Sequence, residues 1–140
     1  MGTSRLRSIV FDCAHPSRLA VFWADTLGYT VRPYDQAEID RLHAMGLDVD
    51  SDPSVVIDPP GDGPTIWFNL VPEPKAAKNR VHVDINLSNL DEVMRLIERG
   101  ARVLRPLDAV PEERWLIMAD PEGNEFCASP PEARVPGRSN

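Results

Sequence analysis

The two halves of this chain follow one plan, and the duplication limits what the chain can fold into. Within its 140 residues, hydrophobic periodicity reads twice as a strand, an amphipathic helix and three further strands. Gly28 and Gly100 follow the two helices, where a left-handed cap is common. The last hairpin of each half turns on an Asp-Pro-x-Gly sequence, at residues 58–61 and 120–123. This self-similarity indicates an internal repeat of one supersecondary unit.

The predicted elements of each repeat form a small sheet with a helix on one face. Strands are predicted at residues 8–14, 29–34, 54–57, 65–71, 78–87, 102–104, 115–119 and 125–128, and helices at 17–27, 36–45 and 88–99. The uncovered sheet faces must pack on something or line a hollow. We therefore predict an α+β fold in which two βαβββ modules form a curved mixed sheet around a central cavity.

The domain boundaries follow from the same pattern. One domain is predicted over residues 1–128, with a first module at about 6–71 and a second at about 79–128. Residues 72–78, with two prolines, suit neither helix nor sheet and read as the linker. From residue 129 onward, proline, glycine and the lack of large apolar residues predict a flexible tail over 129–140.

The charge balance argues against two classes of partner. With 22 acidic and 15 basic residues the formal net charge is −7, which repels phosphate backbones and anionic membranes. No apolar run is long enough to cross a bilayer and no secretory leader is recognisable, so a cytoplasmic protein is expected. Cys13 and Cys127 fall inside predicted strands and read as packed thiols, without disulfide or zinc-site spacing.

The strand predicted at residues 78–87 carries the most distinctive polar face. Val81, Val83, Ile85 and Leu87 alternate with His82, Asp84 and Asn86. An imidazole changes charge near neutral pH, so His82 is a candidate general base if this face lines a concave surface. The alternative is a strand histidine hydrogen-bonded to Asp84 with no chemical role.

Three segments of the chain are typical of one known family. They are HPSRLAVFWADTLGY in the first half, KNRVHVDINLSNLDEVMRLIERGARV at the start of the second half, and WLIMADPEGNEFC near its end. With the βαβββ repeat, they resemble the vicinal oxygen chelate superfamily of glyoxalase I, bleomycin-resistance proteins and extradiol dioxygenases, and above all its glyoxalase-like domain branch. The resemblance covers about residues 6–129. It implies the paired-module fold and a homodimer, but it names no reaction, because one fold hosts many chemistries.

The resemblance also implies where a metal would bind. Metal-dependent members take one ligand from each of four strands, and these positions fall at Ser8, Trp67, His82 and Cys127. Only His82 is an ordinary ligand there, so we expect the standard metal site to be lost and no cofactor to be required. A two-residue slip would bring Asn69 and Glu125 toward His82, and a divalent ion held by His82, Glu125 and water is the alternative.

The remaining candidates point to ligand binding. Trp67 and Trp115 alternate with polar neighbours and form either an aromatic wall or part of the core. Asp84 and Asp12 lie on polar strand faces, and Asp12 also suits a structural ion pair. Cys127 is a packed thiol or a substrate contact.

Three functions remain open on the sequence alone. We predict a glyoxalase-like small-molecule-binding protein, with His82 and Glu125 as the catalytic candidates and Asp84, Asn69, Trp67, Asp12, Cys127 and Trp115 as ligand-binding candidates. The alternative is a metal-assisted lyase, isomerase or dioxygenase that uses His82. The third is an interaction module whose cavity is filled by its own side chains.

Overall fold

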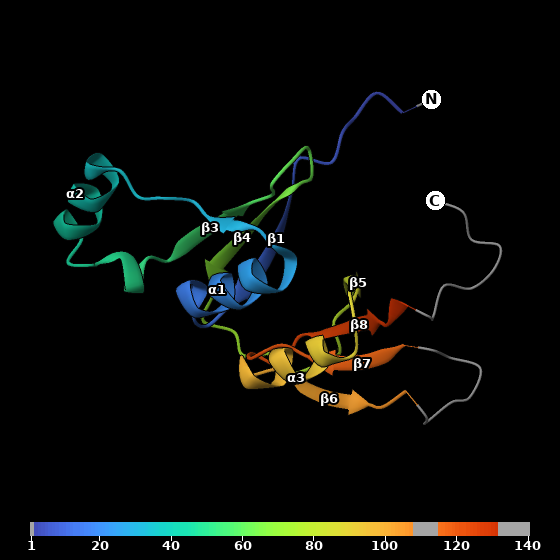
Figure 1. Cartoon of the computed structure of the whole chain (residues 1–140). Helices are drawn as coiled ribbons and strands as arrows, with labels where there is room; N and C mark the ends of the chain where they lie inside the picture. The colour runs from blue at the N-terminus through green and yellow to red at the C-terminus, as the bar shows by residue number, and fades with distance from the viewer. Residues whose placement is uncertain (1, 108–114, 132–140) are drawn as a thin grey trace. The chain divides into compact units, whose positions relative to one another are not determined.

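The computed structural model describes residues 2–107 and 115–131. The chain divides into two compact units, Met1–Pro74 and Lys75–Asn140 (Figure 1). Each unit contains one four-stranded mixed sheet, which confirms the predicted α+β class and the βαβββ plan. The boundary falls inside the predicted linker.

The first unit contains strands β1 (Ser8–Cys13), β2 (Thr30–Val31), β3 (Ser54–Asp58) and β4 (Thr65–Leu70). They lie in the order β1-β4-β3-β2, with β1 parallel to β4 and the other pairs antiparallel. The helices are α1 (Pro16–Leu27), α2 (Gln36–Ala44) and a short 3₁₀ turn, η1 (Val49–Ser51). The strand predicted at residues 29–34 is shorter in the structure: its ladder pairs are Thr30 and Val31, and the N–H of Arg32 makes one more bond, to the carbonyl of Val56 at 3.0 Å. The pairing ends before Pro33, which has no amide hydrogen to donate.

Helix α1 packs on one face of the first sheet (Figure 1), and its buried side chains are apolar. Pro16 occupies the first turn, where its missing amide hydrogen costs nothing, and Gly28 closes the helix with a φ of 68°. The spacing of Leu19, Phe22, Trp23 and Leu27 predicts one apolar stripe, and the first three of these residues are buried while Leu27 is half-buried. Phe11 of β1 lies 5.5 Å from Trp23 and 5.4 Å from Phe68 of β4 between ring centroids. This aromatic cluster is the core of the first unit.

The opposite face of the first sheet is the polar one. Asp12 pairs with Asn69, and Val10 with Trp67, across the parallel β1–β4 ladder. Because successive side chains of a strand alternate, these four side chains share the face that α1 does not cover.

The second unit repeats the topology of the first. Strands β5 (Asp84–Asn86), β6 (Arg102–Arg105), β7 (Leu116–Ala119) and β8 (Glu125–Ser129) lie in the order β5-β8-β7-β6, and β5 is parallel to β8. Helix α3 (Asp91–Glu98) follows β5 (Figure 1). It buries Leu96. The internal repeat is confirmed.

The registers of the two sheets show which residues are equivalent. Trp67 pairs with Val10 on one side and Val56 on the other, and Cys127 pairs with Asp84 and Ile117 in the same way. Trp67 is therefore the repeat partner of Cys127, and Val10 that of Asp84. Counting back two residues makes Ser8 the partner of His82, as the resemblance implied.

Strand β5 is much shorter than the predicted strand at residues 78–87. Only Asp84–Asn86 pair, and Val81, expected on the apolar face, is 80% exposed. Just before β5, the carbonyl of Val83 still accepts a hydrogen bond from the backbone N–H of Cys127 at 3.0 Å. Farther back, the segment is tied to β8 by a side chain, because the backbone N–H of Asn79 donates to the carboxylate of Glu125 at 3.0 Å.

The predicted tail begins too early. Ser129 belongs to β8, and its carbonyl accepts a hydrogen bond from the backbone N–H of Leu87 at 2.8 Å. Residues 132–140 of that prediction lie outside the described residues. In the part of the chain that is described, no helix combines the length and the apolar character that crossing a membrane requires.

Candidate functional site

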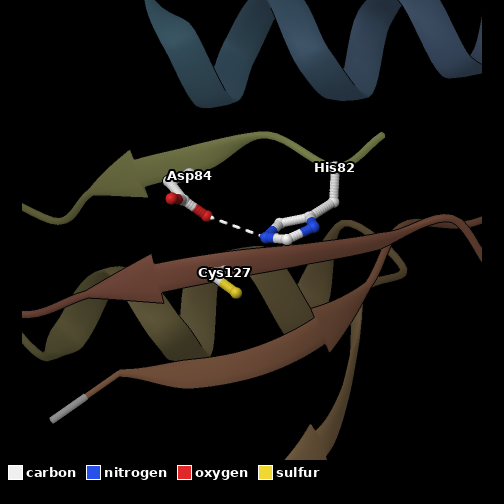
Figure 2. Close-up of side chains that lie close together, drawn as sticks. All are labelled: His82, Asp84 and Cys127. Atoms are coloured by element: carbon white, nitrogen blue, oxygen red, sulfur yellow. Dashed lines mark ion pairs between the residues drawn. The ribbon is translucent and has the colours of Figure 1, made fainter. Parts of the chain in front are cut away.

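One group of three potential metal-ligating side chains lies close together among the described residues: His82, Asp84 and Cys127. We call it the His82 cluster. Its ligand atoms all lie within 4.8 Å of one another, and Nε2 of His82 is 3.2 Å from Oδ1 of Asp84. Figure 2 shows the imidazole turned toward the Asp84 carboxylate, with the Cys127 thiol beside them on β8. The pairing of Asp84 with Cys127 across the parallel ladder brings the thiol to the other two groups.

The thiol of Cys127 is held in its neutral form. Burial raises its pKa above the ordinary value, and the negative charge of Asp84 and a hydrogen bond with it raise the pKa further. The positive charges of Arg105 and Lys78 act in the opposite direction and are smaller effects. A protonated thiol is a poor nucleophile, so this cluster is not arranged for thiolate attack.

Glu125 takes part in a different set of contacts. Its carboxylate accepts from the backbone N–H of Asn79 at 3.0 Å and from the ammonium of Lys75 at 3.2 Å. Chiefly the Asn79 hydrogen bond, with smaller help from Lys75, lowers the pKa of Glu125 to about 2. The carboxylate is therefore ionised at neutral pH and too weakly basic to abstract protons efficiently there. Its contacts fix the approach to β5.

Glu125→Gln is expected to lower the free energy of unfolding by about 1 kcal/mol at pH 7, because hydrogen bonds to charged groups are stronger than neutral ones. The folded pKa lies below the unfolded value, so the stabilisation is complete above about pH 4.5 and is lost as the pH falls toward 2. Urea unfolding of both proteins at several pH values measures the difference. A difference that grows toward pH 3 would contradict this assignment.

Three other predicted residues lie together in the first unit. Asp12, Trp67 and Asn69 share the polar face of the first sheet. Asp12 is exposed, while the amide oxygen of Asn69 accepts from the hydroxyl of Ser54 at 2.7 Å. The ion pair considered for Asp12 is absent from the described residues. This face and the His82 cluster belong to different units, and the cavity predicted between the modules stays a prediction.

A hollow of about 260 Å³ lies beside Trp67, and we call it the Trp67 hollow. Its lining consists of Arg32, Pro33, Tyr34, Glu38, Arg41, Asp52, Ser54, Val55, Val56 and Trp67. The guanidinium of Arg32 lies over the indole, 5.8 Å from the ring centroid. The sequence predicted Trp67 as a candidate but not the lining residues between 32 and 41. Only the fold brings α2 and the segment before it to this face of the sheet.

A larger hollow of about 800 Å³ opens at the start of α1. It is lined by Ala14, His15, Pro16, Ser17, Arg18, Val21, Asp50, Ser51, Asp52 and Leu70. The hydroxyl of Ser17 donates to the carbonyl of Asp50 at 2.8 Å, which joins α1 to η1. The pairing spans 33 positions, and no sequence signal announces it. The lining contains no aromatic ring except the imidazole of His15.

Trp115, the second predicted aromatic wall, immediately precedes β7 in the second unit. The guanidinium of Arg105 lies 5.7 Å from its ring centroid. Among the described residues, each unit thus has an arginine over a tryptophan, although the two tryptophans are not repeat partners.

The four ligand positions implied for metal-dependent proteins do not fit a divalent ion. Ser8 and Trp67 offer a hydroxyl and an indole, and an indole has no lone pair for a metal. The His82 cluster fits better, since imidazole, carboxylate and thiolate are all zinc ligands. Its third donor, Asp84, is not one of the four positions.

Comparisons with known proteins agree with this architecture. The crystal structure of a glyoxalase/bleomycin resistance protein/dioxygenase family enzyme from Burkholderia phytofirmans PsJN is similar to this chain, with a TM-score of 0.61 and 14% sequence identity over 91% of this chain and 98% of that one. A member of the glyoxalase/bleomycin resistance protein/dioxygenase superfamily from Sphaerobacter thermophilus DSM 20745 is similar with a TM-score of 0.57 and 20% sequence identity, over 91% of this chain and 97% of that one. TnmS3, an antibiotic binding protein from Streptomyces sp. CB03234, is similar with a TM-score of 0.57 and 17% sequence identity, over 94% of this chain and 98% of that one.

These likenesses establish the fold class, that of the glyoxalase/bleomycin resistance/dioxygenase superfamily. A family model described as a glyoxalase-like domain matches residues 8–129, nearly the whole chain. The chain belongs to the glyoxalase-like domain family. No curated protein sequence matched it.

Proposed function

We propose that the protein binds a small molecule in the Trp67 hollow and works without the four-ligand metal site of metal-dependent superfamily members. The observation that carries the proposal is this hollow, which has an aromatic wall on the sheet face that α1 leaves open. Ligand sites are typically concave, with an apolar wall and a few polar groups that fix orientation. The likeness to an antibiotic binding protein supports binding as an activity this fold can perform.

Fluorescence titration with small aromatic compounds and aromatic antibiotics tests the proposal. The chain has three tryptophans, so a Trp115→Phe background leaves buried Trp23 and half-buried Trp67 as reporters. At least one compound is expected to change the emission saturably, and Trp67→Phe in the same background should remove most of the change. Trp23→Phe, the matched control, should leave it in place.

Saturable binding that survives Trp67→Phe unchanged, measured by calorimetry, would place the ligand elsewhere. If no compound of the series produces a saturable change, small-molecule binding at this hollow is refuted.

A second candidate function rests on the His82 cluster. Three protein ligands within reach of one another match the number found in catalytic zinc sites, where a fourth position stays open. A bound divalent ion would act as a Lewis acid on a substrate oxygen. His82, Asp84 and Cys127 would hold it, and Cys127 would give up its proton on binding. This candidate corresponds to a metal-assisted lyase, isomerase or dioxygenase.

Metal content separates the two functions. If the protein is a metal-assisted enzyme, protein purified without chelators should carry about one equivalent of a divalent metal. The His82→Ala variant should lose this metal, and the His43→Ala variant should keep it. His43 lies on α2 in the first unit and is the matched control. Metal-free protein that also fails to take up added Zn²⁺ would refute it.

A further inference from the structure

The charged groups around the Trp67 hollow are not equally available to a ligand. Arg32 is engaged by Asp58 in a two-pronged ion pair, with N–O distances of 2.7 and 2.9 Å. Asp52, 5% exposed, accepts from the hydroxyl of Tyr34 at 2.8 Å and from the backbone N–H of Ser54 at 2.9 Å. These groups already have strong partners and shape the walls.

The acidic side chain of α2 is also occupied. Glu38 completes a capping box, since its carboxylate accepts from the backbone N–H of Asp35 while its own N–H donates to the Asp35 side chain. The carboxylate is therefore turned back to the start of the helix.

Arg41 is the remaining charged lining group. Its guanidinium makes one long contact, 3.7 Å to the sulfur of Met45, and among the described residues no carboxylate lies within 4.0 Å of it. An exposed arginine alone is ordinary, but this one borders a hollow whose other charges are satisfied. A guanidinium of this kind prefers a carboxylate, which it can bind with two parallel hydrogen bonds.

The other walls favour a flat apolar ring. Trp67 and Val56 are neighbours in the β3–β4 register and face the same side, and Val56 is 8% exposed. Tyr34 adds a second aromatic ring, fixed by its bond to Asp52. A volume of about 260 Å³ lies below the range of about 300 to 1,000 Å³ typical of drug-sized ligands, so one ring system fits.

We propose that the Trp67 hollow selects small planar aromatic ligands that carry one carboxylate, with the ring against Trp67 and the carboxylate on Arg41. This inference rests on the proposed binding function and adds the chemical class of the ligand. The net charge of −7 repels anions at long range, so the selection must come from the local guanidinium.

Calorimetry with a matched pair of probes, indole-3-acetate and indole-3-acetamide, tests the charge requirement. At low salt the acid is expected to bind at least tenfold more tightly than the amide. Arg41→Gln should remove that preference, because it weakens the acid far more than the amide. Arg41→Lys, which keeps the charge but not the two-pronged geometry, should retain part of it. Trp67→Phe should weaken both probes about equally, by roughly threefold to tenfold, the worth of an aromatic pair.

Arg18→Gln is the control, because Arg18 lines the larger hollow at α1. A loss of acid binding in Arg18→Gln and not in Arg41→Gln would overturn the assignment. Equal binding of acid and amide, weakened by Trp67→Phe, would refute the carboxylate requirement while the binding function stands. Absence of binding by both probes would refute the ligand class, whereas the binding function is judged by the wider series of compounds.

Discussion

Asp120→Ala is expected to lower the free energy of unfolding by about 3 kcal/mol, because it removes a carboxylate that organises the β7–β8 turn. Asp120 is fully buried. Its Oδ1 accepts from the backbone N–H groups of Glu122 at 2.9 Å and Asn124 at 3.0 Å, and its Oδ2 accepts from the side-chain amide of Asn124 at 2.9 Å. Without the carboxylate, these partly buried donors lose their acceptor.

The repeat supplies the matched control. Asp58 begins the same Asp-Pro-x-Gly sequence in the first unit, but it pairs with Arg32 at the surface, with about a third of its side chain exposed. The Arg32 guanidinium lowers the pKa of Asp58, yet exposed pairs contribute only about 0 to 1 kcal/mol. Asp58→Ala should therefore cost less than 1 kcal/mol. Urea unfolding followed by circular dichroism measures both variants, and equal losses would contradict the distinction.

Cobalt(II) is expected to bind at the His82 cluster with an absorption band from thiolate-to-metal charge transfer, if the second candidate function holds. Cys127→Ser should abolish the band, and His82→Ala or Asp84→Asn should weaken the affinity by at least 100-fold, because each removes one of only three protein ligands. Absorption spectroscopy during a Co²⁺ titration measures both effects.

Cys13→Ser is the control for the loss of a thiol. Cys13 is buried in β1, and its thiol donates to the carbonyl of Asn69. The band should persist in this variant. Co²⁺ uptake without a thiolate band, or a band that survives Cys127→Ser, would exclude the cluster as the site. Binding should also weaken as the pH falls, because protons compete for the imidazole and the thiolate.

The fold was predictable because its signals are local and repeated. Gly28 and the stripe of Leu19, Phe22 and Trp23 define α1 within twelve residues, and the two Asp-Pro-x-Gly turns mark the hairpins. The strand at residues 78–87 was the main error. Alternation alone cannot show that the backbone contacts with β8 begin only at Val83, whose carbonyl accepts from Cys127, or that Glu125 holds Asn79 with its side chain.

The site was predictable only in part, because it depends on register. His82 and Asp84 are two residues apart, so strand alternation predicts that their side chains share a face. Only the parallel pairing of Asp84 with Cys127 brings the thiol to them. Likewise, the sequence alone indicated Trp67 as a candidate. Arg41 lines the same hollow but lies on α2, far from Trp67 in the sequence, so only the fold brings the two together. Glu125 as a group that assists His82 stays a prediction, and its contacts in the structure are with Lys75 and Asn79.

Equivalent positions of the two units carry side chains of different chemistry. The positions of His82, Asp84 and Cys127 in one copy are taken by Ser8, Val10 and Trp67 in the other. One unit thus carries an imidazole, a carboxylate and a thiol where the other carries a hydroxyl, an aliphatic chain and an indole. The same backbone register therefore presents metal-ligating groups in one unit and an aromatic surface in the other, with no change in strand pairing.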